Sequence, residues 1–181
     1  MKIITGSARG VALRTLPGAH TRPTTQRIKE ALFSAIQFDV EGREALDLFA
    51  GSGALGIEAL SRGAAHCTFV DNNPAAVEVI RRNLAAARLE EKATVRRQDA
   101  AACIAAMREP VDLVFLDPPY EANLLAPTLA LLAPKIRSGG VVMAESDAEI
   151  QLPEQIGGLA LAKAYRYGRT VIYKYLKGET I

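Results

Sequence analysis

The tetrapeptide Asp117-Pro118-Pro119-Tyr120 follows a short apolar run and carries side chains suited to chemistry on an amine. Its prolines fix the backbone and remove two N–H donors, so the segment presents its carbonyls rigidly. We expect the Asp117 carboxylate and the Pro118 carbonyl to accept hydrogen bonds from one planar amino group, with Tyr120 stacked on the base that carries it. These four residues are candidate catalytic residues. Taken alone, they also fit a structural turn with a capping Asp and a core Tyr.

A glycine-rich turn lies where the first apolar run should pass into a helix. Gly51, Gly53 and Gly56 have the spacing G-x-G-x-x-G, and Asp71 follows Gly51 by twenty residues. Glycines let a ligand approach the main chain, and an acid after the second strand accepts both hydroxyls of a ribose. The same pattern describes a dinucleotide site, so a nicotinamide or flavin oxidoreductase stays open. Asp47, four residues before Gly51, favours an S-adenosylmethionine site, where the turn wraps a cationic methionine group.

Short apolar runs alternate with helical patterns along the chain, and this alternation predicts the fold. Strands are expected over 45–50, 66–70, 94–97, 111–116 and 140–144. Helices are expected over 24–38, 55–62, 74–88, 100–108 and 124–136. The near-continuous apolarity of the runs suits parallel strands, and the segments on either side of Gly168 alternate like an antiparallel hairpin. We therefore predict an α/β fold with a Rossmann-like, mostly parallel sheet and an antiparallel C-terminal hairpin.

The net charge of +2 is divided unevenly along the chain. Residues 1–38 carry six basic and one acidic residue (+5), residues 39–154 carry eleven and eighteen (−7), and residues 155–181 carry five and one (+4). Two basic ends beside an acidic middle indicate that the ends hold a polyanion, although each end also fits a solvated face. We divide this single domain into a basic N-terminal extended or hairpin segment, 1–23, and a catalytic part, 24–181.

Composition excludes several classes of protein. In 181 residues, 49% apolar and 23% charged side chains suit one globular domain rather than a disordered chain. No uncharged stretch approaches the ~18 apolar residues of a membrane span, and no signal peptide precedes Arg9. Two cysteines and two histidines predict neither a disulfide framework nor a metal site. The sequence thus predicts a cytoplasmic monomer without metal or membrane partner.

Several blocks of the sequence together resemble one known family. They are DLFAGSGALGIEALSRGA (47–64), FVDNNPAAVEVIRRNL (69–84), DPPY (117–120), and Arg22-Pro23-Thr24 followed by RIKEALF (27–33). The opening IITGSARGVALRTLPG and the closing YRYGRTVIYKY extend the resemblance to nearly the whole chain. The family is that of the bacterial 16S ribosomal RNA guanine-N2 methyltransferases, which are class I S-adenosylmethionine-dependent enzymes. Ser34 departs from it, since the family usually has Asn there.

The resemblance implies methyl transfer to the exocyclic N2 amine of a guanine in 16S ribosomal RNA, within a small-subunit particle. The donor is S-adenosylmethionine, the product S-adenosylhomocysteine, and no metal takes part. The implied cofactor-binding residues are Asp47, Phe49, Gly51, Gly53, Asp71, Asn72, Asp99 and Ala100. The expected RNA-binding residues are Arg9, Arg14, Arg22, Thr24, Arg27, Arg166 and Arg169, with Lys29 and Lys174 as further basic candidates. Asp117 to Tyr120 would hold the guanine, which must leave its helix to reach them.

Three other classes of protein remain to be separated from this one. An amino-directed DNA methyltransferase acting on adenine or cytosine shares Asp-Pro-Pro-Tyr, but it usually carries a DNA-recognition region for which this chain has little room. A non-catalytic ribosome assembly factor with a vestigial cofactor fold would not need the intact Asp71 and Asp117. A nicotinamide oxidoreductase has no role for residues 117–120. Methyl transfer to RNA or DNA, and nicotinamide binding, discriminate among them.

Overall fold

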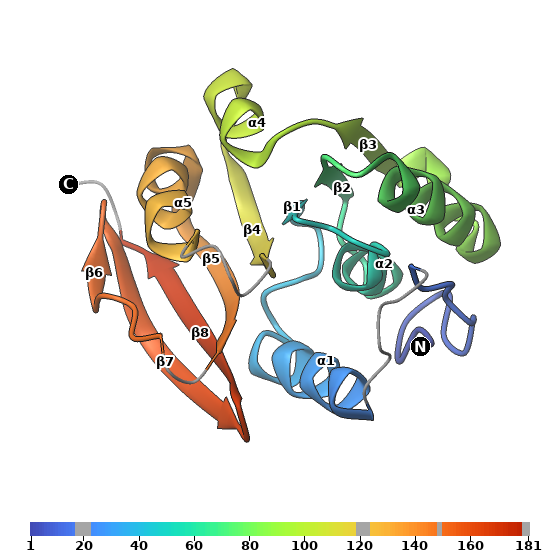
Figure 1. Ribbon diagram of the computed structural model, residues 1–181, viewed down its shortest axis with the longest axis horizontal. Coiled ribbons are helices and arrows are strands. Elements are labelled where there is room, and N and C mark those ends of the chain that lie inside the picture. Colours follow the sequence, from blue (N-terminus) through green and yellow to red (C-terminus); the bar gives the residue numbers. More distant parts are fainter. Residues whose placement is uncertain (17–22, 119–123, 148–149, 179–181) are drawn as a thin grey trace.

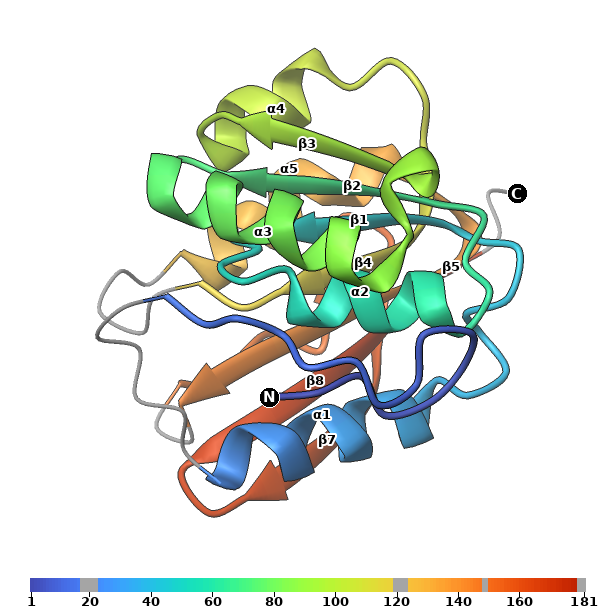
Figure 2. The same cartoon turned by 90° about the vertical axis from the view of Figure 1, so that its right-hand side faces the viewer.

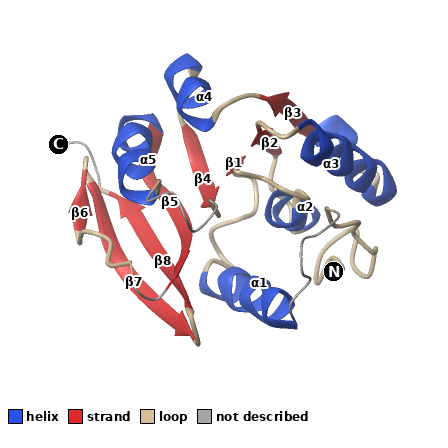
Figure 3. Cartoon of the chain, viewed as in Figure 1, coloured by secondary structure: helices blue, strands red, loops and turns tan. Residues whose placement is uncertain are grey.

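A mixed β-sheet forms the centre of the molecule (Figure 3). The computed structural model describes residues 1–16, 23–118, 124–147 and 150–178. The strands are β1 (Glu44–Leu48), β2 (His66–Asp71), β3 (Ala93–Arg97), β4 (Val111–Leu116), β5 (Ile136–Asp147), β6 (Gln155–Ile156), β7 (Leu159–Tyr167) and β8 (Thr170–Lys177). In the order β3-β2-β1-β4-β5-β8-β7-β6, neighbours up to β5 are parallel and those from β5 onward antiparallel. The predicted fold class is confirmed.

Helices cover both faces of this sheet. They are α1 (Pro23–Ala35), α2 (Ala54–Ser61), α3 (Pro74–Ala87), α4 (Ala100–Ala106) and α5 (Leu125–Leu132), with short 3₁₀ turns at Glu90–Lys92 and Ala133–Lys135. The first three helices lie on one face, and α4 and α5 lie on the other (Figure 1). No helix within the described ranges is long and apolar enough to cross a membrane.

Each face of the sheet has its own buried cluster of apolar side chains. On the side of α1 to α3, the rings of Phe33 and Phe115 lie 5.5 Å apart, with Ile57 and Ile80 in the same cluster. On the side of α4 and α5, Leu116 belongs to a second cluster with side chains of both helices. Burial on both faces is what parallel strands require, and it explains their near-continuous apolarity. The sheet is therefore a rigid platform for the loops at its ends.

Several predicted element boundaries differ from the structure by a few residues, among them those of the first strand, the fifth helix and the fifth strand. The first strand ends at Leu48 rather than at residue 50, because Phe49 has a φ of 61° that no strand accommodates. The fifth helix ends at Leu132 and continues as a 3₁₀ turn that contains Pro134, which has no N–H to donate. The fifth strand is longer than predicted, since it begins at Ile136 and its pairing with β4 shifts register before residue 141.

The N-terminal residues 1–16 fold back on themselves and pack against α2 (Figure 2). The Ile3 amide donates to the Val11 carbonyl at 2.9 Å. The Glu58 carboxylate of α2 accepts the amides of Ile4 at 2.8 Å and Thr5 at 3.0 Å. Ile3 is buried in the same cluster as α1 and α2 side chains, so this segment is part of the core. A chain division at residue 23 stays a prediction.

Asn83 of α3 joins the N-terminal segment to the glycine-rich turn. Its side chain is 1% exposed. The Oδ1 atom accepts the Arg14 amide at 2.8 Å, and Nδ2 donates to the carbonyls of Arg14 at 3.0 Å and Ser52 at 2.8 Å. Two segments that are distant in sequence thus depend on one buried amide for their polar partners.

Asn83→Ala is expected to lower the free energy of unfolding by about 2–4 kcal/mol, because it leaves three partly buried backbone groups without their side-chain partner. Denaturant unfolding measures this cost. Asn73→Ala is the matched control on the same helix: Asn73 caps α3 by accepting the Ala75 amide at 2.9 Å, and its loss should cost only about 1 kcal/mol. Equal losses for the two variants would contradict the proposed role of Asn83.

Candidate active site

Parallel pairing brings the ends of four strands to one edge of the sheet, which we call the carboxyl edge. Leu48 of β1 pairs with Val70 of β2 and Leu116 of β4, and Asp71 of β2 pairs with Arg97 of β3. The glycine-rich turn after β1 and Asp117 after β4 are therefore neighbours in space. Open α/β sheets bind their ligands at this edge.

The turn after β1 departs from ordinary backbone conformations. Phe49, Gly51 and Gly53 have φ values of 61°, 56° and 76°, which glycine adopts freely and Phe adopts only under constraint. The Gly51 amide donates to Asp71 Oδ2 at 2.9 Å, so the turn is tied to the end of β2. The turn thus opens a space above β1 that is held from two strands.

The three glycines of the motif have different tasks. Gly51 lines the cavities described below, whereas Gly53 is buried as the left-handed N-cap of α2 and lies outside their described lining. At Gly56 an added Cβ would meet Phe69 Cε1 at 2.3 Å, so only glycine allows α2 to pack this closely on β2. Two of the three glycines therefore shape the site rather than line it.

Two cavities open at the carboxyl edge and share Phe49, Gly51 and Asp117 in their walls. The first, of about 150 Å³, is lined by Met1, Ile28, Lys29, Asp47, Phe49, Ala50, Gly51, Ser52, Ala54, Leu55, Asp117 and Glu145. The second, of about 470 Å³, is lined by Phe49, Gly51, Val70, Asp71, Asn72, Gln98, Asp99, Ala100, Asp117, Pro118 and Leu124. We call them the acidic cavity and the wide cavity. An elongated ligand that occupies both must pass Asp117.

Carboxylates dominate the acidic cavity. Asp47 is 2% exposed, and its burial raises the pKa of its carboxyl group to about 8. A hydrogen bond of 2.9 Å from the Gly56 amide lowers this pKa, and the nearby Asp71 carboxylate raises it. The pKa of Asp117 is also raised, by the protein atoms crowded around it and by the Glu145 and Asp47 carboxylates. Because Asp117 keeps a face exposed at the cleft, we give the carboxylate repulsion more weight than the loss of water. A cationic ligand would relieve this repulsion.

The wide cavity combines acceptors with apolar walls. Asp71 Oδ1 accepts the Asn73 amide at 2.8 Å, and Asp99 caps α4 by accepting the Ala102 amide at 3.0 Å. These bonds orient both carboxylates and leave them lone pairs for hydroxyl or amine donors. Val70 and Leu124 supply apolar surface for a planar ring. Of the eight residues expected to bind the cofactor, the structure brings seven to these two cavities, Gly53 being the exception.

Some predicted residues fall where the structure gives no description. Pro119, Tyr120 and Arg22 lie outside the described residues, as does the side chain of Thr24. The expected stacking of Tyr120 and the expected RNA contacts of Arg22 and Thr24 therefore stay predictions.

Several basic residues expected at the RNA surface lie near the carboxyl edge. Asp147 of β5 pairs with Thr170 of β8, which places the β7–β8 turn, with exposed Arg166 and Arg169, beside the end of β5. Arg169 forms a 3.6 Å ion pair with Asp147. Arg27 belongs to the first half of α1, which begins on the same side (Figure 2). Arg14 is held beside the glycine-rich turn by the Asn83 amide.

Three other basic residues do not belong to that surface. Arg9 follows Ala8, whose amide donates to Ser61 Oγ at the C-terminal end of α2, so Arg9 lies at the opposite end of the helix from the cavities. Lys29 is 2% exposed, and Lys174 is held by the Ala35 carbonyl at 3.0 Å and Asp39 at 2.9 Å. The structure therefore does not favour RNA contacts for these three residues at the carboxyl edge, and such contacts elsewhere stay a prediction. Position in the chain alone did not separate them from the exposed arginines.

Several lining residues were not expected at these cavities from the sequence, and four of them illustrate why. Lys29 and Glu145 line the acidic cavity, and Gln98 and Leu124 line the wide one. Gln98 directly precedes Asp99, which was expected at the site, so its position in the turn after β3 could have predicted it. Glu145 lies in a strand whose end was placed at residue 144, and Lys29 looked like one basic residue among several.

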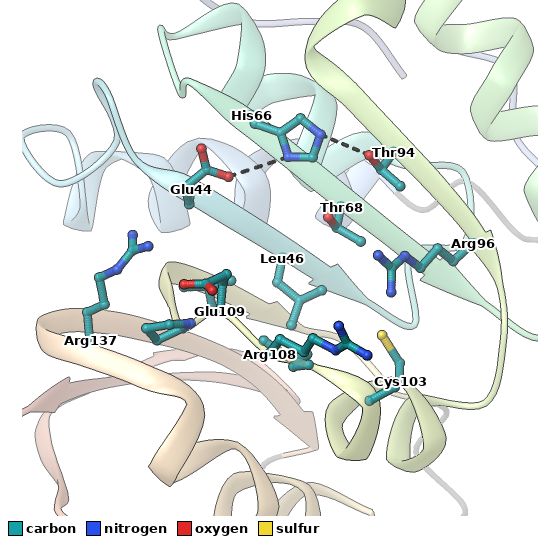
Figure 4. A pocket seen from close by; sticks show the side chains of 14 residues that line it. Glu44, Leu46, His66, Thr68, Thr94, Arg96, Cys103, Arg108, Glu109 and Arg137 are labelled. Carbon is teal, nitrogen blue, oxygen red and sulfur yellow. Dashed lines mark hydrogen bonds and ion pairs between the residues drawn. The ribbon is translucent and has the colours of Figure 1, made fainter.

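Another cavity, of about 640 Å³, opens near the amino-terminal ends of β1 to β4 (Figure 4). There His66 lies 3.5 Å from Glu44 and 3.0 Å from Thr94 Oγ1. Of the predicted site residues that the structure describes, none lines this cavity. No group of three or more His, Cys, Asp or Glu side chains in the described part of the chain is arranged to hold a metal ion. The predicted chemistry thus gathers at the carboxyl edge.

Comparisons with known proteins point to one family. The family model described as "Conserved hypothetical protein 95" matches residues 1–176. "Putative rRNA methyltransferase YlbH" of Bacillus subtilis is 42% identical over 182 residues, which cover 98% of this chain and 99% of that protein. "Ribosomal RNA small subunit methyltransferase D" of Escherichia coli is 36% identical over 155 residues, which cover 84% of this chain and 78% of that protein.

The fold of this chain is also similar to that of a solved structure. The "Putative methyltransferase yhhF" of Escherichia coli superposes with a TM-score of 0.87 at 33% identity, and the alignment covers 99% of each chain. The match therefore includes the N-terminal segment and the C-terminal hairpin as well as the central sheet. This chain belongs to the family of "Conserved hypothetical protein 95", the bacterial 16S ribosomal RNA methyltransferases.

Proposed function

We propose that this protein transfers a methyl group from S-adenosylmethionine to the exocyclic N2 amine of one guanine in 16S ribosomal RNA. The observation that carries the proposal is the position of Asp117, which lines both cavities at the place where they meet. A donor that spans the two cavities presents its reactive centre to this carboxylate. Membership of a ribosomal RNA methyltransferase family supports the substrate class.

The residues of the two cavities fit the proposed donor. S-adenosylmethionine supplies a methyl group activated on a sulfonium centre. Asp47, Asp117 and Glu145 suit the cationic end of this molecule, because buried carboxylates are stabilised by a nearby positive charge. Asp71 and Asp99 offer acceptors to a ribose and an adenine amine, while Val70 contacts the ring. The walls of the two cavities thus offer carboxylates, hydrogen-bond acceptors and apolar surface to the corresponding parts of the donor.

Asp117 and Pro118 would position the guanine amine for direct attack. The lone pair of N2 is delocalised into the ring, and two acceptors on its hydrogens favour the pyramidal form in which this pair is available. The N–C bond forms as the S–C bond breaks, with the sulfur leaving as the neutral thioether. One N2 proton departs after transfer, and the Asp117 carboxylate, which accepts a hydrogen bond from this amine, is in place to receive it. Position and electrostatics supply most of the catalysis.

Labelled-methyl transfer to three substrates tests this function. Small ribosomal subunits that lack the modification, naked 16S RNA and duplex DNA are each incubated with the protein and labelled S-adenosylmethionine. We expect label in ribosomal RNA, with the particle as the better substrate. Label confined to DNA would replace the proposal with amino-directed DNA methylation. Cofactor binding without label in any substrate would favour an assembly factor.

The exposed arginines at the carboxyl edge are expected to bind RNA phosphates. Replacing Arg14, Arg27 and Arg166 together by alanine should weaken RNA binding and reduce the slope of log K against log salt by about 2–3, because each phosphate contact contributes about 0.7–0.9. Filter binding at several salt concentrations measures both quantities.

A second triple variant provides the matched control. Arg9, Lys92 and Arg108 are also exposed, and they lie toward the amino-terminal ends of the strands. Replacing them removes the same net charge but should leave the salt slope almost unchanged. If both triple variants lost the same affinity, RNA binding would depend on net charge alone and not on this edge.

A further inference from the structure

Lys29 is a buried lysine in the wall of the acidic cavity. It lies in α1 and is 2% exposed, yet it lines the cavity together with Asp47, Asp117 and Glu145. Among the described residues of this wall, it is the only basic side chain. Lysine is rarely buried without a paired partner. It lies beside three carboxylates of this wall but forms its ion pair with Glu58, which does not line the cavity, and this arrangement requires an explanation.

The partners of Lys29 account for only part of its bonding capacity. Nζ lies 3.1 Å from Glu58 Oε2 and donates to the Lys2 carbonyl at 2.8 Å. An ammonium group carries three N–H donors. Within the described ranges these are its hydrogen-bond and ion-pair partners, so one donor is left for a group in the cavity.

The charge of the local cluster also leaves a surplus. Glu58 is fully buried and pairs with Arg62 at 2.8 Å as well as with Lys29. Two cations against one carboxylate give the cluster a net charge of +1. This positive charge faces a cavity whose other ionisable side chains are all acidic. The two signs are separated along the wall, so the cavity is complementary to a zwitterion.

We propose that Lys29 binds the carboxylate of the methionine portion of S-adenosylmethionine, while the facing acids hold its cationic groups. The inference rests on the proposed use of this donor and adds the residue that recognises one end of it. A ligand that has lost its carboxyl group would leave the third N–H of the buried Lys29 ammonium without an acceptor. The site should therefore reject decarboxylated forms of the cofactor.

The test compares two ligands on one protein by calorimetry. The first is S-adenosylhomocysteine, and the second is decarboxylated S-adenosylhomocysteine, which keeps the amine. For the unmodified protein we expect the second ligand to bind at least ~10-fold more weakly, because it lacks the charge-assisted hydrogen bond to Lys29. In Lys29→Met the ratio of the two dissociation constants should fall to about one. Lys29→Arg, which keeps the charge, should retain part of the discrimination.

The Lys29→Met variant should fold. Glu58 keeps Arg62 and the amides of Ile4 and Thr5, so the substitution does not leave a buried charge unpaired. Lys174→Met is the matched control. Lys174 also binds one backbone carbonyl and one carboxylate beside α1, but it is absent from the described walls of both cavities. Its ligand ratio should equal that of the unmodified protein.

The ratio separates ligand recognition from a purely structural role. A structural defect weakens both ligands equally and preserves the ratio, so an unchanged ratio in Lys29→Met would overturn the inference. An initial ratio near one would overturn it as well, while leaving the proposed donor intact. Absence of binding by both ligands would instead refute the use of S-adenosylmethionine, and the inference with it.

Discussion

Asp117→Ala is expected to reduce methyl transfer by at least ~100-fold, since it removes an acceptor that acts on the amine during transfer. Affinity for S-adenosylhomocysteine should stay nearly unchanged, because this product has no sulfonium charge for Asp117 to stabilise. Single-turnover rates and calorimetric titration measure the two quantities separately. A loss confined to the rate is the signature of a group that works on the methyl acceptor.

Asp112→Ala is the control for this variant. Asp112 lies in β4, the strand that leads to Asp117, but near the amino-terminal end of that strand. There it forms ion pairs with Arg137 at 3.0 Å and Arg43 at 4.0 Å. Its loss should affect stability and leave the transfer rate close to normal. Normal methylation by Asp117→Ala would show that amine positioning is assigned to the wrong residue.

Asp47→Asn is expected to remove a pH dependence from cofactor binding. With a pKa of about 8, Asp47 is protonated at neutral pH in the empty protein. The ammonium group of the ligand favours the ionised form, so the proton must leave when the ligand binds. Affinity for S-adenosylhomocysteine should therefore rise between pH 6 and pH 8, by at most about tenfold per pH unit, and stop rising once Asp47 is already ionised.

The raised pKa of Asp47 makes the stability of the fold decrease with pH, whereas it makes ligand affinity increase with pH. The folded protein holds a proton that the unfolded chain releases above the ordinary carboxyl value of 3.8, so Asp47 lowers stability as pH rises from there to about 8. Ionisable groups that bear on Asp47 are Asp71, Asp117 and Cys67, with Lys29 and Glu145 in the same cavity wall. In Asp47→Asn this contribution to the pH dependence of stability should disappear.

Calorimetric titration with S-adenosylhomocysteine between pH 6 and pH 8 checks the binding prediction. The pH dependence that remains in Asp47→Asn measures the contribution of the ligand's own amine, which is subtracted. Glu44→Gln is the control, because Glu44 begins the strand that carries Asp47 but lies beside His66, outside both cavities. It should keep the pH dependence of the unmodified protein. The same dependence in Asp47→Asn would mean that another group releases the proton.

Much of the fold follows from local patterns. The alternation of apolar runs with helical periods requires a mostly parallel sheet, and a parallel sheet brings the ends of its strands to one edge. This rule is why the sequence alone places Asp47, Asp71 and Asp117 together. The glycine spacing likewise predicts the turn that Gly51 forms between them.

The remaining features depend on packing between segments that are distant in sequence. The burial of Lys29 follows from the N-terminal segment crossing α2, and no local pattern specifies that crossing. The position of Arg9 away from the carboxyl edge could not be predicted for the same reason, because it depends on how the N-terminal segment packs on α2. Glu145 was missed because strand ends are poorly specified by apolarity.

Identification of the methylated nucleoside tests the central claim most directly. Small ribosomal subunits are labelled with the protein and S-adenosylmethionine, the RNA is digested to nucleosides, and the labelled product is compared with standards. The expected result is N2-methylguanosine as the single labelled nucleoside, lost with Asp117→Ala and kept with Asp112→Ala. Label on another base, or on another atom of guanine, would contradict the assignment of the guanine amine to Asp117 and Pro118.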